Sequence, residues 1–191
     1  DFDRESRTGL AEAVFCQGKS ISQLRTICET IVKAGKPMLF TRLSASQYRE
    51  LEESHSGLLA YDEVSKTAFF LIGDSQASVP VAVVTGGSSD LSVAREACRT
   101  LEFCGHEALE VHDVGVAGLW RMTERLEELR GCKIIICVAG MDAALPTVLG
   151  GLVSAALIAV PTSVGYGMVK GGETALHSLL VSCAPGVTVT N

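Results

Sequence analysis

Four short polar segments each stand at the end of a predicted strand, and together they hold most of the side chains that could take part in chemistry. They are "TGGSSD" (85–90), "HDVGVAG" (112–118), "VAGMD" (138–142) and "PTSVGYG" (161–167). In the first, glycines let the backbone approach an anion, and the helix that follows offers unpaired N–H groups at its start. We predict that this segment binds an anion; a simple helix cap by Ser89 or Asp90 is the alternative.

Two further carboxylates stand at comparable places. Asp113 stands at the end of a predicted strand, where it either fixes the loop or contacts a ligand. Asp142 precedes a helical pattern, where a carboxylate either caps the helix or holds a metal ion or a substrate hydroxyl. The segment 161–167 combines small polar residues, glycines and Tyr166, a composition that suits wrapping a ring or a phosphate, or a turn that Tyr166 covers.

The thiol of Cys183 is the remaining candidate, at the end of an apolar helical run and just before Pro185-Gly186. A cysteine in such a place either packs as a small hydrophobe or faces a ligand as a thiolate. The other six cysteines are expected to serve packing. Their total of seven is odd and includes neither a CxxC pair nor a zinc-type Cys/His cluster, which indicates reduced thiols in a cytoplasmic protein.

The overall composition argues against several classes of function. The chain has 191 residues, a net charge of −6 and no dense basic patch, which argues against nucleic acid as a partner. Gly, Pro or polar residues interrupt every long apolar stretch, so no membrane span is expected, and the charged start does not resemble a signal peptide. The four histidines lie in unrelated contexts, which argues against a histidine metalloenzyme or a Ser-His-Asp hydrolase.

Two regions must position these side chains. Residues 1–75 are rich in charge and predict a small α+β domain, and 74–79 predict a linker. From 80 to 191, short apolar strands alternate with helical segments of about 10 to 14 residues. This alternation predicts an α/β fold, a three-layer, doubly wound parallel sheet. Ligands of such sheets bind beyond the carboxyl ends of the strands, which is where the four polar segments fall.

The assembled motifs resemble a known family. "DRESRTG" near the start, "DVGVAGL", "ALP" shortly after "VAGM", "PTSVGYG" and "SCAPGV" are similar to the LarB-type pyridinium dicarboxylate mononucleotide synthases of nickel-pincer cofactor assembly. Those enzymes form a branch of the aminoimidazole ribonucleotide (AIR) carboxylase, or PurE, superfamily. The resemblance covers nearly the whole chain and implies a flavodoxin-like fold and a homo-oligomer, expected to be an octamer.

One position separates the two branches of that superfamily. The purine carboxylases carry a histidine two residues before the proline of "HLP", whereas this chain has Ala144 before Leu145-Pro146. Cys183 in "SCAPG" matches the cysteine of the pyridinium branch instead. That branch usually has Glu followed by Gly where this chain has Asp142 and Ala143.

The resemblance implies a reaction on nicotinic acid adenine dinucleotide, with CO2 or bicarbonate as co-substrate and Mg2+ as the expected cofactor. The Cys183 thiolate adds to the pyridinium carbon opposite the nitrogen, which makes the adjacent carbon nucleophilic. That carbon attacks CO2, and loss of the ring proton with expulsion of the thiolate restores aromaticity. The branch also hydrolyses the pyrophosphate and releases AMP.

The resemblance assigns the remaining roles as well. Asp142 is a base or a metal-linked carboxylate, and Asp90 and Asp113 orient ribose, water or Mg2+. The residues expected to contact the phosphates and the ring are Thr85, Gly86, Gly87, Ser88, Ser89, Gly115, Gly140, Met141, Thr162, Ser163, Gly165, Tyr166, Gly167 and Ser182, with Lys19 and Arg42 from the N-terminal domain. Two alternatives stay open: a carboxylase or mutase of purine synthesis, and a nucleotide-binding relative without catalysis.

Overall fold

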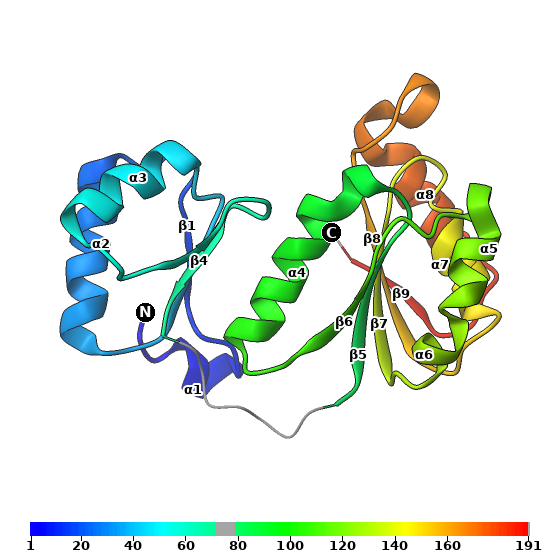
Figure 1. The fold of residues 1–191 in the computed structure, drawn as a ribbon, viewed down its shortest axis with the longest axis horizontal. Coiled ribbons are helices and arrows are strands. Elements are labelled where there is room, and N and C mark those ends of the chain that lie inside the picture. Colours follow the sequence, from blue (N-terminus) through cyan, green and yellow to red (C-terminus); the bar gives the residue numbers. More distant parts are fainter. Residues whose placement is uncertain (72–78, 191) are drawn as a thin grey trace. The chain divides into compact units, whose positions relative to one another are not determined.

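The computed structural model of the chain describes residues 1–71 and 79–190. They form two compact units, and each has its own sheet (Figure 1). The first unit contains the N-terminal residues together with Arg99–His106, and the second contains the rest of the described C-terminal part. The linker expected over 74–79 lies outside the described residues, apart from Val79.

The first unit is a mixed sheet of four strands with helices packed on it. Its strands have the order β1-β2-β4-β3, in which β1 and β2 run parallel and the other pairs antiparallel. The elements are α1 (Arg4–Thr8), β1 (Ala13–Phe15), α2 (Ile21–Ala34), β2 (Met38–Thr41), α3 (Ala45–Ser54), β3 (Ala60–Asp62) and β4 (Thr67–Phe70). The sequence did not predict α1 or β1, because segments of five and three residues carry too little periodicity.

Helices α2 and α3 begin with the same capping motif. Ser20 accepts a hydrogen bond from the backbone N–H of Gln23, and the Gln23 side chain accepts one from the backbone N–H of Ser20. Ser44 and Gln47 repeat this capping box at α3. Each box satisfies donors that a helix start otherwise leaves unpaired, so these short polar motifs fix where the helices begin.

The second unit is a five-stranded, fully parallel sheet in the order β6-β5-β7-β8-β9. Three 3-10 turns, η1 (Ser88–Asp90), η2 (Val116–Gly118) and η3 (Gly167–Gly172), precede helices. The strands and helices are β5 (Val81–Thr85), α4 (Leu91–Phe103), β6 (Ala108–Val111), α5 (Leu119–Glu124), α6 (Leu126–Arg130), β7 (Ile134–Ala139), α7 (Ala144–Gly150), β8 (Ala156–Pro161), α8 (Glu173–Leu180) and β9 (Val187–Val189). Helices α5 and α6 are separated at Arg125, whose ψ of 1° is not helical.

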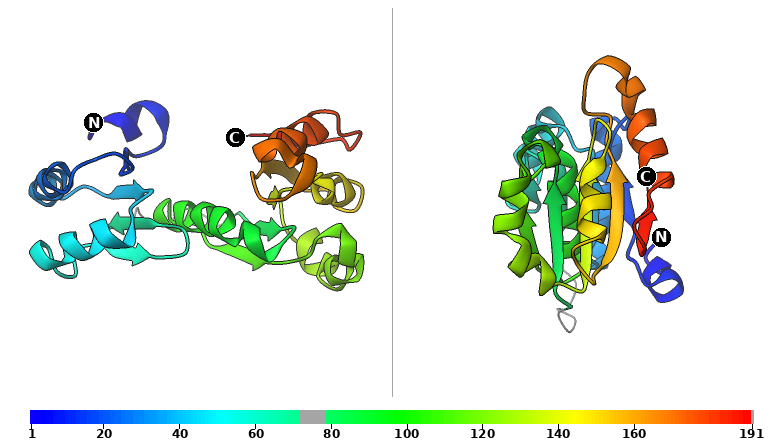
Figure 2. Two further views of the ribbon diagram at one scale, coloured as in Figure 1. Left: turned by 90° about the horizontal axis from the view of Figure 1, so that it is seen from above. Right: turned by 90° about the vertical axis from the view of Figure 1, so that its right-hand side faces the viewer.

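Helices lie on both faces of this sheet, which confirms the predicted three-layer α/β fold. Helix α4 covers one face and α5 to α8 cover the other (Figures 1 and 2). Right-handed crossovers explain the division, because β5 to β6 moves toward one edge while β6 to β7, β8 and β9 moves toward the other. On the face shared by α5 to α7, a core forms around Val84, Met122, Ile135, Leu149 and Leu157.

The described residues include no helix with the length and apolar character that crossing a bilayer requires.

Candidate functional site

A pocket of about 360 Å³ lies at the carboxyl ends of β5, β6 and β7, where the fold was expected to bind a ligand. This volume falls within the range of small-molecule sites. Residues of three of the four predicted polar segments line this pocket together. The fourth segment, 161–167, contributes Val164. The residues that line it are Gly86, Gly87, Ser88, Ser89, Asp90, Asp113, Gly115, Val116, Ala117, Arg121, Ala139, Gly140, Met141, Asp142, Ala143, Ala144, Leu145 and Val164.

Asp90 ties two of the loops together. Asp90 is only 3% exposed, and its Oδ1 accepts a 2.7 Å hydrogen bond from the Thr162 hydroxyl. Oδ2 accepts one from the backbone N–H of Gly87 at 3.0 Å. Helix α4 begins at Leu91, directly after the turn η1 that contains Asp90. Asp90 therefore holds the glycine-rich loop against the loop after β8, while Ser88 and Ser89 remain exposed at the pocket.

Two glycines allow the loops to approach each other. A Cβ atom at Gly115 would lie 2.6 Å from the carbonyl oxygen of Gly86. At Gly140, a Cβ would collide with the carbonyl oxygen of Val164 and lie 2.7 Å from Thr162 Oγ1. The pocket walls are thus built from backbone segments in direct contact, which leaves no space for a side chain at either position.

Asp113 has an ion-pair partner that the sequence analysis missed. The Arg121 guanidinium donates through Nη1 to Asp113 Oδ2, and both residues line the pocket. Asp113 has a left-handed φ of 58°, and its backbone N–H donates to Thr85 Oγ1 at 2.9 Å. The available signal was the position of Arg121 in the first turn of the helix that follows "DVGVAG".

The neighbouring His112 does not line the pocket. Its Nε2 lies 3.0 Å from Glu110 Oε2, and neither residue lines the pocket. His112 is therefore a structural side chain, whereas Asp113 faces the pocket. Strand β6 ends at Val111 and Asp113 has a left-handed φ, so the turn after the strand separates the two side chains.

Asp142 is exposed at the pocket and does not cap α7. The residue at the cap position is Ala143, and no side chain makes the capping hydrogen bond there. Met141 and Ala143, on either side of Asp142, have φ values of 57° and 47°. Such backbone angles are unfavourable for residues with a Cβ, and they persist where surrounding structure enforces them, often at functional sites. Asp142 is thus free to contact a ligand.

The segment after β8 contributes less to the pocket than predicted. Thr162 is buried and bonded to Asp90, whereas Ser163, Gly165, Tyr166 and Gly167 are exposed and do not line the pocket. Tyr166 is 81% exposed, and Met168 is 76% exposed. Thr85, which was expected to contact substrate, is fully buried and accepts from Asp113 instead.

Cys183 also lies outside the pocket of its own chain. It is exposed, in the turn between α8 and β9, and that turn is at the amino end of β9 whereas the pocket is at carboxyl ends. Its neighbour Ser182 is 2.7 Å from Thr147, hydroxyl oxygen to hydroxyl oxygen, on α7. Leu180 and Val181 beside it are 63% and 81% exposed. The structure therefore does not bring Cys183 or Ser182 to the other predicted residues within one chain.

The remaining cysteines are buried or half-buried. Burial raises the pKa of Cys16 to about 12 and that of Cys28 to about 11, and it raises the pKa of Cys98 to about 12. The pKa of Cys137 is raised by complete burial and then by the nearby Asp90. These thiols are held in the neutral form that suits packing.

Lys19 and Arg42 lie in the first unit, just after the parallel strands β1 and β2. The Gln47 amide donates to the carbonyl oxygens of Lys19 and Cys16, which fixes the turn that holds Lys19. Arg42 is exposed and has a φ of 55°. Lys19 also borders a hollow of about 430 Å³ beside β1 and α2.

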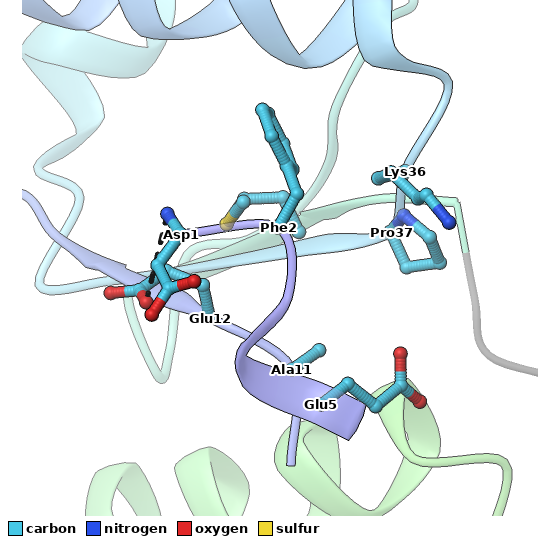
Figure 3. Close-up of a pocket in the computed structure, with 8 residues that line it drawn as sticks. Asp1, Phe2, Glu5, Ala11, Glu12, Lys36 and Pro37 are labelled. Carbon is cyan, nitrogen blue, oxygen red and sulfur yellow. Dashed lines mark ion pairs between the residues drawn. The ribbon is translucent and has the colours of Figure 1, made fainter. Parts of the chain in front are cut away.

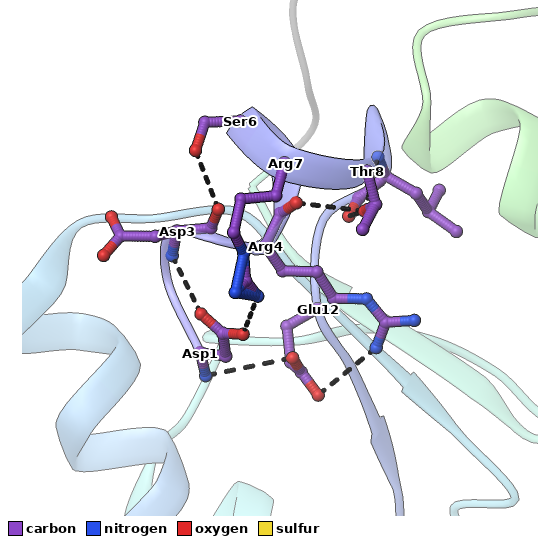
Figure 4. A network of polar contacts seen from close by, with 8 residues as sticks. Asp1, Asp3, Arg4, Ser6, Arg7, Thr8 and Glu12 are labelled. Carbon is purple, nitrogen blue, oxygen red and sulfur yellow. Dashed lines mark hydrogen bonds and ion pairs between the residues drawn. The ribbon is translucent and has the colours of Figure 1, made fainter.

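The first twelve residues form a polar network around Glu12. Arg4 Nη1 lies 3.6 Å from Glu12, and Arg7 pairs with Asp1 (Figure 4). The hollow that Phe2, Glu5 and Lys36 border here has a volume of only about 20 Å³ (Figure 3). It is too small for a nucleotide, and exposed ion pairs of this kind contribute little stability.

Comparison with known proteins agrees with this geometry. Residues 80–191, which contain the whole pocket, match the AIR carboxylase family. The chain belongs to the AIR carboxylase family. Residues 1–71 match the LarB/PurE-like N-terminal domain, so it is a LarB-type member of the PurE superfamily, as the motifs predicted.

A relative of this AIR carboxylase family member is known in an archaeon. The chain is 36% identical over 200 residues to an uncharacterized protein of Methanocaldococcus jannaschii, and the match covers all of this chain and 77% of that protein. The family supports carboxylation as the class of reaction.

Proposed function

We propose that the chain carboxylates the pyridinium ring of nicotinic acid adenine dinucleotide and releases AMP. The observation that carries this proposal is the side chain at position 144. In the purine carboxylases a histidine stands there; in this chain Ala144 lines the pocket, and no histidine is among the described residues that do. A pocket without an imidazole lacks the group that moves protons in the purine reaction.

Covalent activation by a thiolate would replace that imidazole. Cys183 is exposed, so its thiol is accessible to groups outside its own chain. The thiolate adds to the ring carbon opposite nitrogen, the adjacent carbon forms a bond to CO2, and a carboxylate such as Asp142 accepts the ring proton. The C–S bond then breaks and the electron pair returns to sulfur, so the thiolate is regenerated.

Mg2+ fits this site as part of a complex with the substrate. The described residues contain no group of three or more His, Cys, Asp or Glu that could hold a metal by themselves. Mg2+ commonly binds to one or two carboxylates together with substrate phosphates and water. Asp113 is the exposed carboxylate that would hold it, and the ion would balance charge on the pyrophosphate during its hydrolysis.

The separation of Cys183 from the pocket implies that a second copy supplies the thiol. The exposed Leu180 and Val181 flank Cys183 and would be covered in an oligomer, for which an octamer is the expected form. Mixing a Cys183→Ala variant with an Asp142→Ala variant then regenerates complete sites. We expect about a quarter of wild-type activity after random subunit exchange.

The central assay uses the purified protein with nicotinic acid adenine dinucleotide, bicarbonate and Mg2+, followed by mass spectrometry. We expect a carboxylated mononucleotide product and AMP, and loss of both in the Cys183→Ala variant. Carboxylation of aminoimidazole ribonucleotide instead would favour the purine reaction. Binding of the dinucleotide with no product would identify a non-catalytic relative.

A further inference from the structure

The charges that line the pocket are unbalanced for an anionic substrate. Asp90, Asp113 and Asp142 carry three carboxylates, and Arg121 is the one Lys or Arg side chain among the described residues that line it. A dinucleotide carries negative charge on its phosphates, so a carboxylate-rich pocket repels it unless a cation compensates. Arg121 is therefore the side chain on which anion binding by this pocket depends.

The guanidinium of Arg121 has donors to spare. Of its nitrogen atoms, Nη1 donates to Asp113, and no hydrogen bond joins Nε or Nη2 to another residue that the structure describes. Arg121 lines the pocket and its side chain is 32% exposed. The edge that carries Nε and Nη2 lies beside Gly118, which has no side chain to cover it. A planar guanidinium with two adjacent free donors suits bidentate contact with phosphate oxygens.

The pair with Asp113 is easily exchanged. The Asp113 side chain is 49% exposed, and ion pairs at that exposure contribute little. Asp90, by contrast, is committed to Thr162 and Gly87. The pyrophosphate of a dinucleotide carries two negative charges, one on each phosphate, and competes well with a single exposed carboxylate for the same guanidinium.

The place of Arg121 favours phosphate as the anion. Its partner Asp113 is bonded through its backbone to Thr85, the first residue of "TGGSSD", and Gly115 contacts the Gly86 carbonyl. The guanidinium and the glycine-rich loop thus border the same part of the pocket. Gly118 leaves room for the guanidinium in this position, because a Cβ at residue 118 would lie 2.7 Å from Arg121 Nε.

We infer that Arg121 leaves Asp113 and binds the phosphate oxygens of the nucleotide, which frees the Asp113 carboxylate for Mg2+ or ribose. This inference rests on the proposed function for the identity of the nucleotide. The binding of phosphate by Arg121 can be measured without turnover, so the two can fail separately.

The test measures binding of inorganic pyrophosphate to the full chain in buffer without divalent cations. Calorimetry can follow it, as can fluorescence of Trp120, the single tryptophan, which precedes Arg121. We expect Arg121→Gln to weaken binding at least about ten-fold, and Arg121→Lys to weaken it less. Asp113→Asn should keep or raise the affinity, because it removes the competing carboxylate. With Mg2+ present, Asp113→Asn should instead weaken binding.

A merely structural ion pair predicts a different pattern, in which Arg121→Gln and Asp113→Asn weaken binding equally. That outcome, or unchanged affinity in Arg121→Gln, would overturn the inference.

Gly118→Ala keeps every charge but displaces the guanidinium, so it should weaken binding several-fold. Nicotinate is the second probe: if Arg121→Gln impairs nicotinate and leaves pyrophosphate unaffected, the arginine binds the ring carboxylate and the inference is wrong. Carboxylation failing while these effects hold would refute only the proposed function.

Discussion

Cys183 differs from the other cysteines in its access to solvent, and this difference predicts selective chemistry. Cys183 is exposed, whereas burial raises the pKa of Cys16 and Cys98 to about 12 each. At pH 8 a thiol with such a pKa is about one part in 10,000 thiolate. We expect iodoacetamide to modify one cysteine rapidly under native conditions, as measured by intact mass. The Cys183→Ala variant is the control, and rapid labelling that persists in it would contradict the assignment.

The two hydrogen bonds that the Asp90 carboxylate accepts predict that replacing this carboxylate lowers stability. Replacing it by Asn leaves one oxygen to accept from either Thr162 or Gly87. The amide NH2 then faces either the Gly87 N–H, which cannot accept, or the Thr162 hydroxyl, which must turn to accept and loses its bond to a charged group. We expect Asp90→Asn to lower the free energy of unfolding by about 1 to 3 kcal/mol in urea titrations. Ser88→Ala, at an exposed neighbour, should change it by less than about 0.5 kcal/mol. Equal effects would show that Asp90 does not join the loops.

The loops around the pocket make a prediction about glycine. Gly140→Ala introduces a methyl group against the Val164 carbonyl and Thr162, and backbone in both loops must move. Gly86→Ala meets Ala139 Cβ at 3.6 Å, an ordinary contact. We expect Gly140→Ala to cost about 1 to 3 kcal/mol in thermal unfolding and Gly86→Ala to be tolerated. Similar melting temperatures for the two variants would contradict the close approach of these loops.

Elements with strong patterns could be predicted, and short or interrupted ones could not. The runs of β5, β7 and β8 are visible because all of their residues except Thr85 are apolar. Helix α2 is visible because Leu24, Cys28 and Ile31 repeat on one face. Strand β1 has three residues and owes its existence to pairing with β2, which is a tertiary effect. The break between α5 and α6 likewise has no Gly or Pro to announce it.

The site could be predicted in the same uneven way. Asp113 and Asp142 were found because they follow apolar strands, and the topology brings strand ends together. Arg121 was missed because a charged residue in an amphipathic helix usually faces solvent. The position of Cys183 depends on which end of the sheet its turn occupies, and a match of motifs carries no such information.

At the scale of the whole molecule, buried thiols couple stability to alkaline pH. In the first unit, Cys16 and Cys28 have pKa values raised from 9.0 to about 12 and about 11. Between pH 9 and 11 the unfolded chain loses these protons and the folded chain keeps them, so unfolding releases protons and stability falls as pH rises. Each thiol contributes a slope of about 1.4 kcal/mol per pH unit in that window, and none below it.

Thermal unfolding of the full chain from pH 8 to 10.5 checks this coupling. A Cys16→Ala/Cys28→Ala variant is expected to start from a lower melting temperature, because two buried sulfur atoms are lost. Its melting temperature should then fall less steeply with pH than that of the wild type. Parallel curves would mean that these two thiols do not carry the effect.

The strand order of the second sheet also determines when each strand can pair with its neighbours during synthesis of the chain. Strand β5 is internal, with β6 on one side and β7 on the other, so its second neighbour leaves the ribosome only after residue 139 has been made. Strands β7, β8 and β9 then add one after another toward one edge, each directly after it is translated. Domains fold largely from the N-terminus during synthesis, and non-local pairing is slow. We therefore expect nascent chains that stop between β6 and β7 to be the ones that chaperones and proteases engage.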